Sequence, residues 1–192
     1  MAFDCSLFET CKRGCMNLTR SRFLICLLAS VAIHSAAAED KKSTFKAGEL
    51  QFAVAEGWTV KAKARAMSEG GLTYKVAEIK EGLDADFYYF GKGAGGSVEA
   101  NIARWKGQFE GGPKEVESAK LGGGKIDFLH LEGTFLSGPS FGKKTPKKDY
   151  AMLAAIVAHE DGPVFVKMTG PKDEVAKAIV AFKVLAESAY KK

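Results

Sequence analysis

The segment Gly91–Ser97, Gly-Lys-Gly-Ala-Gly-Gly-Ser, holds the residues best spaced for ligand chemistry in this sequence. Gly91, Gly93 and Gly96 fit the G-x-G-x-x-G pattern of a dinucleotide loop, between a predicted strand and a predicted helix. A dinucleotide site also needs a parallel strand that carries an acid for the ribose, whereas the chain after Gly111 leads into hairpin-like strands. We therefore predict a flexible entry loop, called the glycine loop below. A second interpretation stays open, in which free N–H groups at the helix start hold a carboxylate, sulfate or phosphate.

The candidate ligand- or partner-binding residues form two groups. The glycine loop and the helix after it supply the first group: Lys92, Gly93, Gly95, Gly96, Ser97 and Arg104. A predicted loop over Ser137–Lys148 supplies the second group: Lys143, Lys144, Lys147 and Lys148. A basic loop is usually a solvated surface, but it can also contact an acidic partner or an anionic envelope polymer.

Two further patterns do not satisfy the motifs that they approach. Gly138–Thr145 has three residues between its glycines where a phosphate loop has four, and no helix is predicted after it. Ser97, Ser137 and Ser140 are available as hydrolase nucleophiles, but none lies in a nucleophile-elbow sequence.

Histidine is scarce beyond residue 38, where only His130 and His159 occur. A three-histidine metal site is thereby excluded, and we predict neither a metal nor a cofactor. The run His159-Glu160-Asp161 gathers possible ligands, but it falls on a predicted hairpin turn, where adjacent charges are ordinary.

The first 38 residues have the pattern of a secretory signal peptide. A basic stretch precedes the apolar run Phe23–Ile33, which is too short to span a bilayer that needs about 20 residues. We predict cleavage after Ala38, a charged tether over 39–44, a single domain over 45–192 and a periplasmic or secreted location. Met16 would open a signal peptide of ordinary length, so we expect translation to begin there. The alternative is a buried apolar helix of a cytosolic protein.

All four cysteines precede the predicted cleavage site: Cys5, Cys11, Cys15 and Cys26. The predicted mature chain therefore excludes thiol catalysis, disulfides and Cys-ligated zinc. Removing the four basic and two acidic residues of 1–38 from the 28 and 23 of the whole chain leaves a net charge of +3. So slight a charge does not predict nucleic-acid binding.

Periodicity beyond residue 44 predicts many strands and two helices. Ser97 is the predicted N-cap of a helix that runs to about Glu110, and a final helix begins at Pro171. Tyr150–Ala158 is apolar throughout, which is typical of a central strand covered on both faces. The other predicted strands are Leu50–Ala55, Thr59–Ala64 after a break at Gly57 and Trp58, Leu72–Val76, Asp86–Phe90, Glu115–Leu121, Lys125–Phe135 and Val164–Thr169.

Hairpins dominate this order, so we predict an α+β fold, a mostly antiparallel sheet with helices packed on both sides as a layered sandwich. Trp105 lies on the apolar stripe of its helix and is expected in the core. Tyr88 and Tyr89 are expected on opposite faces of the sheet. Lys167 is expected either to extend its ammonium to solvent or to pair with a carboxylate.

Several segments carry a resemblance to known proteins. Phe90–Ser97, followed by Glu99, Asn101, Arg104 and Trp105, is similar to a family of uncharacterised secreted bacterial proteins, as are Tyr150–Ile156 and Gly162–Phe165 with Lys167–Pro171. The opening Leu50–Trp58 resembles the start of the PsbP/Mog1-like sandwich fold. The resemblance implies a compact binding or accessory module, and it carries over no catalytic residue.

These observations predict an exported, soluble, non-enzymatic binding module. Its expected partner is an unidentified protein or an anionic envelope component, and not a nucleic acid. The alternative function is a small hydrolase or a small-anion-binding protein that uses the glycine loop.

Overall fold

The computed structural model describes residues 43–61, 67–139 and 142–191, which belong to one compact unit. The predicted signal peptide, the Met16 start and most of the tether lie outside these residues. The strands are β1 Thr44–Ala47, β2 Leu50–Ala53, β3 Trp58–Lys61, β4 Gly70–Tyr74, β5 Leu83–Tyr89, β6 Phe109–Glu110, β7 Lys114–Leu121, β8 Gly124–Ser137, β9 Thr145–Val157 and β10 Val164–Pro171. The helices are α1 Val98–Lys106, α2 Lys172–Glu187 and a 3-10 turn over Ser188–Tyr190.

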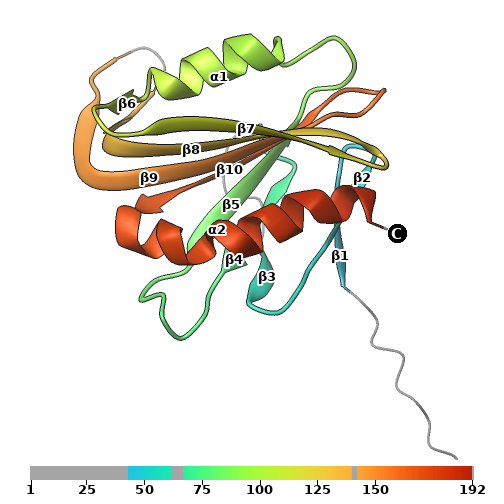
Figure 1. Ribbon diagram of the computed structural model, residues 1–192, viewed down its shortest axis with the longest axis horizontal. Helices are drawn as coiled ribbons and strands as arrows, with labels where there is room; N and C mark the ends of the chain where they lie inside the picture. The colour runs from blue at the N-terminus through green and yellow to red at the C-terminus, as the bar shows by residue number, and fades with distance from the viewer. Residues whose placement is uncertain (1–42, 62–66, 140–141, 192) are drawn as a thin grey trace, which may run out of the picture. The chain divides into compact units, whose positions relative to one another are not determined.

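Eight of the strands form one antiparallel sheet (Figure 1). Its order is β3-β4-β5-β10-β9-β8, and β6 and β7 follow one another along the outer edge of β8. The hairpin β1–β2 forms a separate two-stranded sheet. The predominance of antiparallel pairing agrees with the prediction.

The two helices cover opposite faces of this sheet (Figure 1). β9 shows why, because alternate side chains along a strand point to opposite faces. Met152, Ala154 and Ile156 pack with Trp105 of α1, whereas Leu153 and its neighbours at even spacing pack with α2. The predicted α+β layered sandwich, with helices on both sides of a doubly covered central strand, is confirmed.

Both helices begin where the sequence indicates. Ser97 caps α1, its hydroxyl accepting a hydrogen bond from the Ala100 N–H at 3.1 Å. Trp105 of α1 is buried and meets Phe165 of β10 edge to face, with ring centroids 6.2 Å apart. Pro171 precedes α2, as predicted.

Several predicted boundaries were wrong. Trp58 begins β3 and does not interrupt the chain, and the predicted residues beyond Lys61 lie outside the described part. Helix α1 ends at Lys106 and not near Glu110, because Gly107 caps it and Phe109 pairs with Phe135 of β8. β9 begins at Thr145, so Lys147 and Lys148 lie in a strand and not in a loop.

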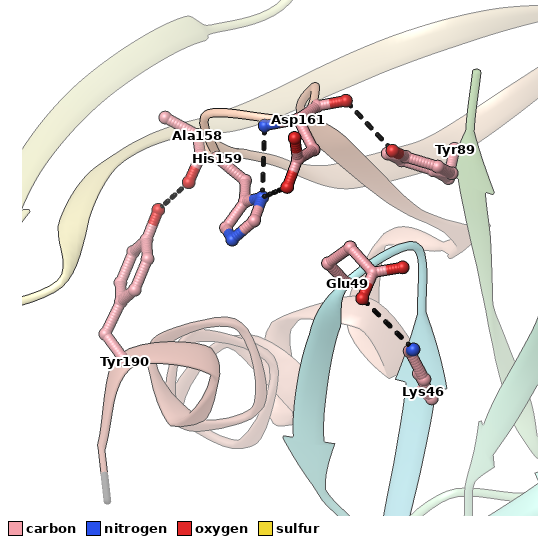
Figure 2. A network of polar contacts seen from close by, with 7 residues as sticks. All are labelled: Lys46, Glu49, Tyr89, Ala158, His159, Asp161 and Tyr190. Atoms are coloured by element: carbon pink, nitrogen blue, oxygen red, sulfur yellow. Dashed lines mark hydrogen bonds and ion pairs between the residues drawn. The ribbon is translucent and has the colours of Figure 1, made fainter. Parts of the chain in front are cut away.

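Tyr190 connects the C-terminal 3-10 turn to one end of the sheet by hydrogen bonding (Figure 2). Its hydroxyl donates to the carbonyl oxygen of Ala158 at the end of β9, and it lies 3.3 Å from the carbonyl oxygen of Lys125 in β8. Its ring lies directly against Gly123 and Gly124 of the β7–β8 hairpin. Burial raises the pKa of the Tyr190 hydroxyl above its ordinary value of 10.0.

Replacing Tyr190 with phenylalanine is expected to lower the free energy of unfolding by about 1 kcal/mol at pH 7, because a hydrogen bond to the sheet is lost. The raised pKa means that folding favours the neutral phenol, so this contribution is complete below the unfolded pKa of 10.0 and is lost as the pH rises above it. Urea titrations of wild type and Tyr190→Phe from pH 7 to about pH 11 measure the difference. It should shrink above pH 10; a constant difference would contradict the assignment.

Candidate functional site

The glycine loop is held by its own contacts. Asn101 is buried, and its Nδ2 donates to the carbonyl oxygens of Gly95 at 2.8 Å and Ser97 at 2.9 Å. Arg104 Nη2 in turn donates to Asn101 Oδ1. The polar groups of Ser97 and Arg104 therefore stabilise the loop and the start of α1, and binding of a ligand there stays a prediction.

The backbone conformation of the loop and the space around it require glycine at position 95. Gly95 has a φ of +83°, and a Cβ there would lie 2.9 Å from the ring of Phe90 and 3.0 Å from that of Phe165. Lys92, Gly93 and Gly96 are exposed. The strands after α1 pair antiparallel, which is not the parallel unit of a dinucleotide fold.

The predicted lysines lie at the other end of β9. Lys143 and Lys144 belong to the turn between β8 and β9, where Lys144 Nζ lies 3.5 Å from the Gly138 carbonyl oxygen and also donates to that of Pro139. The glycine loop instead packs on the β9–β10 turn, since a Cβ at Gly162 would lie 2.5 Å from the Gly91 carbonyl oxygen. The glycine loop and the predicted lysines therefore lie at opposite ends of β9.

A β-bulge brings two side chains of β9 to the same face of the sheet. Gly133 of β8 lies opposite Tyr150 and Phe135 lies opposite Lys147, so one residue of β8 faces two residues of β9. Asp149, within the bulge, has a φ of +55°. Regular alternation would put Lys147 and Tyr150 on opposite faces, whereas the Lys147 ammonium lies 5.1 Å from the centre of the Tyr150 ring.

These two residues border a small cavity beside the C-terminal end of α1. We call it the hairpin hollow; its volume is about 180 Å³, and its principal lining residues are Gln108, Phe135, Lys147, Tyr150, Lys167 and Thr169. Gln108 is positioned by a hydrogen bond from the Leu136 N–H of β8 to its carbonyl oxygen, at 2.8 Å. The hollow thus depends on the end of α1, the bulge and β10 together.

The hollow contains cationic and hydrogen-bonding groups. Lys167 Nζ donates to Gln108 Oε1 at 3.0 Å and lies 5.9 Å from the centre of the Phe135 ring. Thr169 Oγ1 is buried and has no hydrogen-bond partner among the residues that the structure describes. Asp86, which is buried, lies directly opposite Lys167 in the register of β5 and β10.

A larger cavity of about 600 Å³ adjoins the hollow and shares Lys147, Tyr150 and Thr169 with it. It extends past Asp84 of β5 to Glu174 in the first turn of α2. Asp84 forms an ion pair with Lys61, and its Oδ1 accepts a hydrogen bond from the Thr73 hydroxyl at 2.8 Å. The cationic side of the combined space is therefore the hollow.

A third cavity, of about 370 Å³, lies between β7 and α2. Its walls include Phe128, Ile179 and Phe182. At its edge the ammonium of Lys183 in α2 lies 2.5 Å from a carboxylate oxygen of Glu117 in β7. This cavity is mainly apolar, and its charged groups are paired with each other.

The two histidines have local partners. His130 Nε2 lies 3.2 Å from Glu132 Oε1, and Lys172 lies 2.6 Å from the other oxygen of that carboxylate, which raises the pKa of Lys172. His159 Nδ1 accepts from the Asp161 N–H at 3.3 Å on the β9–β10 turn (Figure 2). Among residues 43–61, 67–139 and 142–191, no group of three metal-ligating side chains comes together.

Sequence reasoning included Lys147 among the binding residues and noted Lys167, but it missed Gln108, Phe135, Tyr150 and Thr169 as a group. The one available signal was Asp149, since aspartate tolerates a positive φ better than most residues.

The bulge also predicts a substitution effect. Asp149→Val should lower the free energy of unfolding by about 1–2 kcal/mol, because a β-branched residue is strained at φ +55°.

Chemical denaturation of Asp149→Val and Asp149→Gly measures this effect. Glycine accepts the same backbone conformation, so the glycine variant should be at least as stable as the wild type. Equal stabilities of the valine and glycine variants would show that residue 149 does not adopt a positive φ.

No protein-family model matches the chain, and no curated protein matches it significantly. Among solved structures it is similar to the solution structure of cyanobacterial PsbP (CyanoP) from Synechocystis sp. PCC 6803, with a TM-score of 0.48 and 12% identity, covering 76% of this chain and 89% of that one. The likeness concerns the fold, and we take no ligand, partner or location from it. In the described part of the chain, no helix has the length and apolar character needed to cross a membrane.

Proposed function

We propose that this chain is an exported, non-enzymatic binding module whose ligand site is the hairpin hollow. Export is expected from the signal-peptide pattern of the first 38 residues. The proposed partner class is the one expected from the sequence, an anionic group on a protein or on another component of the cell envelope.

One observation carries the choice of site. Thr169 Oγ1, a buried hydroxyl without a recorded partner among the described residues, belongs to a residue that lines both the hollow and the larger cavity beside it. An unsatisfied buried hydroxyl costs about 1–3 kcal/mol, so proteins seldom keep one without a use. Two lysines and the Gln108 amide line the same space. Ligand-binding cavities usually contain a few such polar groups, which orient the ligand.

The surrounding surface supports an anionic partner. Lys143, Lys144 and Lys148 lie on the same hairpin as Lys147; Lys143 and Lys148 are exposed, and Lys144 is half-buried. Like charges clustered around a cavity raise the local concentration of anions and speed their association at low ionic strength. The hairpin therefore attracts the ligand, and the hollow binds it.

The test is a thermal-unfolding screen of organic acids, phosphate esters, sugars and nucleotides against three chains. Wild type is compared with Ser137→Trp, which adds bulk at another residue that lines the hollow, and with Ala94→Trp, which places the same bulk on the glycine loop. A ligand at about 100 times its Kd stabilises by about 2.7 kcal/mol, or roughly 5–10 °C in Tm for a chain of this size.

We expect at least one probe to raise the Tm of wild type and of Ala94→Trp, but not that of Ser137→Trp. The opposite pattern would move the site to the glycine loop. A screen with no shift in any chain would contradict a small-ligand site altogether.

A further inference from the structure

We infer that the hairpin hollow takes a carboxylate group carried on a small apolar or aromatic body. This inference rests on the proposed function and specifies its ligand chemistry. It follows from the charge, the lining and the size of the hollow, taken in turn.

The charges that line the hollow favour an anion. Lys147 and Lys167 each bring one positive charge to the cavity. Asp86, 2% exposed, lies opposite Lys167 in the register of β5 and β10, so a carboxylate of the chain is already close to Lys167.

Lys147 is the cation best placed for an added anion. Its ammonium lies over the Tyr150 ring at 5.1 Å, and no carboxylate is recorded within 4.0 Å of it among the residues that the structure describes. Lys167, by contrast, already donates to Gln108. A carboxylate in the hollow would therefore accept from Lys147, and rotation of the Thr169 side chain, whose hydroxyl is buried, would bring a second donor to it.

The rest of the wall is aromatic. The rings of Phe135 and Tyr150 lie nearly parallel, at 17°, with centroids 6.3 Å apart. Such a wall removes apolar surface of a ligand from water and offers ring faces for stacking. With a volume of about 180 Å³, the hollow suits a carboxylate with one ring or a short aliphatic chain.

Two sources of such a group differ in what lies behind the carboxylate. It belongs either to a free organic acid or to the C-terminus of a peptide. Five probes separate the possibilities: benzoate, its neutral analogue benzamide, inorganic phosphate, and the tripeptide acetyl-Gly-Gly-Phe in its free-acid form and in its amide form.

The experiment is isothermal titration of each probe, up to about 10 mM, into the chain beginning at residue 39 and into the full chain at low ionic strength. Three variants accompany the wild type: Lys147→Gln, Thr169→Val and the matched control Lys120→Gln, which removes the same charge from an exposed position of β7 that pairs with Lys125, at the other end of β8 from Phe135. Each variant is first checked by thermal unfolding. Thr169→Val should be at least as stable as the wild type, because it removes an unpartnered buried hydroxyl.

We expect benzoate or the peptide acid to bind, and the corresponding amide to bind at least tenfold more weakly. Lys147→Gln should weaken the binding by about tenfold or more, Thr169→Val by several fold, and Lys120→Gln by less than twofold. Binding of benzoate alone identifies a small acid as the source, whereas tighter binding of the peptide acid identifies a chain terminus.

Other results overturn the inference in separate ways. Equal binding of benzoate and benzamide, or a preference for phosphate, would reject the carboxylate but leave the hollow as a binding site. Equal losses in Lys147→Gln and Lys120→Gln would show a diffuse attraction to the net charge and not a site. If no carboxylate probe binds while a sugar or nucleotide raises the Tm in the screen above, the proposed function stands and only this inference fails.

Discussion

Replacing Gly133 with alanine is expected to lower the free energy of unfolding by about 3 kcal/mol or more, and to abolish ligand binding in the hairpin hollow. Gly133 lies in β8 next to the bulge and has a φ of +132°. A Cβ there would lie 2.4 Å from the Glu110 carbonyl oxygen and 2.8 Å from that of Gly111. Both neighbours are backbone atoms, so the segment at β6 must move away from β8.

That movement reaches the proposed site directly. β6 is joined to β8 by the pairing of Phe109 with Phe135, and Gln108 precedes it in the chain. Gln108 and Phe135 both line the hollow. A displaced β6 therefore changes two of its walls.

Urea unfolding of Gly133→Ala, with Gly122→Ala as the matched control, measures the effect. Gly122 lies at the β7–β8 turn with open space at its Cβ position, so its replacement should change the free energy of unfolding by less than about 0.5 kcal/mol. If the two variants are equally stable, the close approach of β6 to β8 is wrong.

Replacing Phe182 with alanine is expected to lower the free energy of unfolding by about 3–5 kcal/mol, and the Tm by roughly 10 °C. Phe182 is 2% exposed on the inner side of α2, in the cluster that joins this helix to the sheet and to the β1–β2 hairpin. Its removal leaves a cavity beside the one that already lies between β7 and α2.

Val180 supplies the control on the same helix. It is 75% exposed, so Val180→Ala removes little buried surface and should shift the Tm by no more than about 2 °C. Differential scanning calorimetry of both variants is the measurement. A loss for Val180→Ala as large as that for Phe182→Ala would mean that the outer face of α2 is buried in solution.

The architecture could be predicted because local patterns and tertiary packing agree. The apolar run at Tyr150–Ala158 predicted a strand covered on both faces, and β9 is covered by α1 on one side and α2 on the other. Strands were predicted over Glu115–Leu121 and Lys125–Phe135, and β7 and β8 pair with each other there as a hairpin. Tyr88 and Tyr89 face opposite clusters, as their adjacency in a strand requires.

The proposed site was less accessible to sequence reasoning because it depends on a break in periodicity. A bulge inserts one residue and so reverses the face of every side chain on one side of it. The residues Thr145–Asp149 resemble a polar loop in composition, yet they extend β9 and place Lys147 beside Tyr150. Gln108 and Thr169 meet there only through tertiary structure, 61 positions apart in the sequence.

The glycine loop shows the opposite case, in which a motif is present but its polar groups are already used. Ser97 caps α1, and Asn101 holds the carbonyl oxygens of Gly95 and Ser97. Arg104 is bonded to Asn101. These contacts account for the residue types at these positions without a ligand.

The location of the binding site is tested most directly by amide chemical-shift mapping of the isotope-labelled chain during a titration with the probe that binds it most tightly. We predict that the largest changes occur at Gln108, Tyr150 and Thr169, while Lys92–Ser97 stay within the experimental error. Largest changes in the glycine loop, or no saturable change at the hairpin hollow, would contradict the assignment.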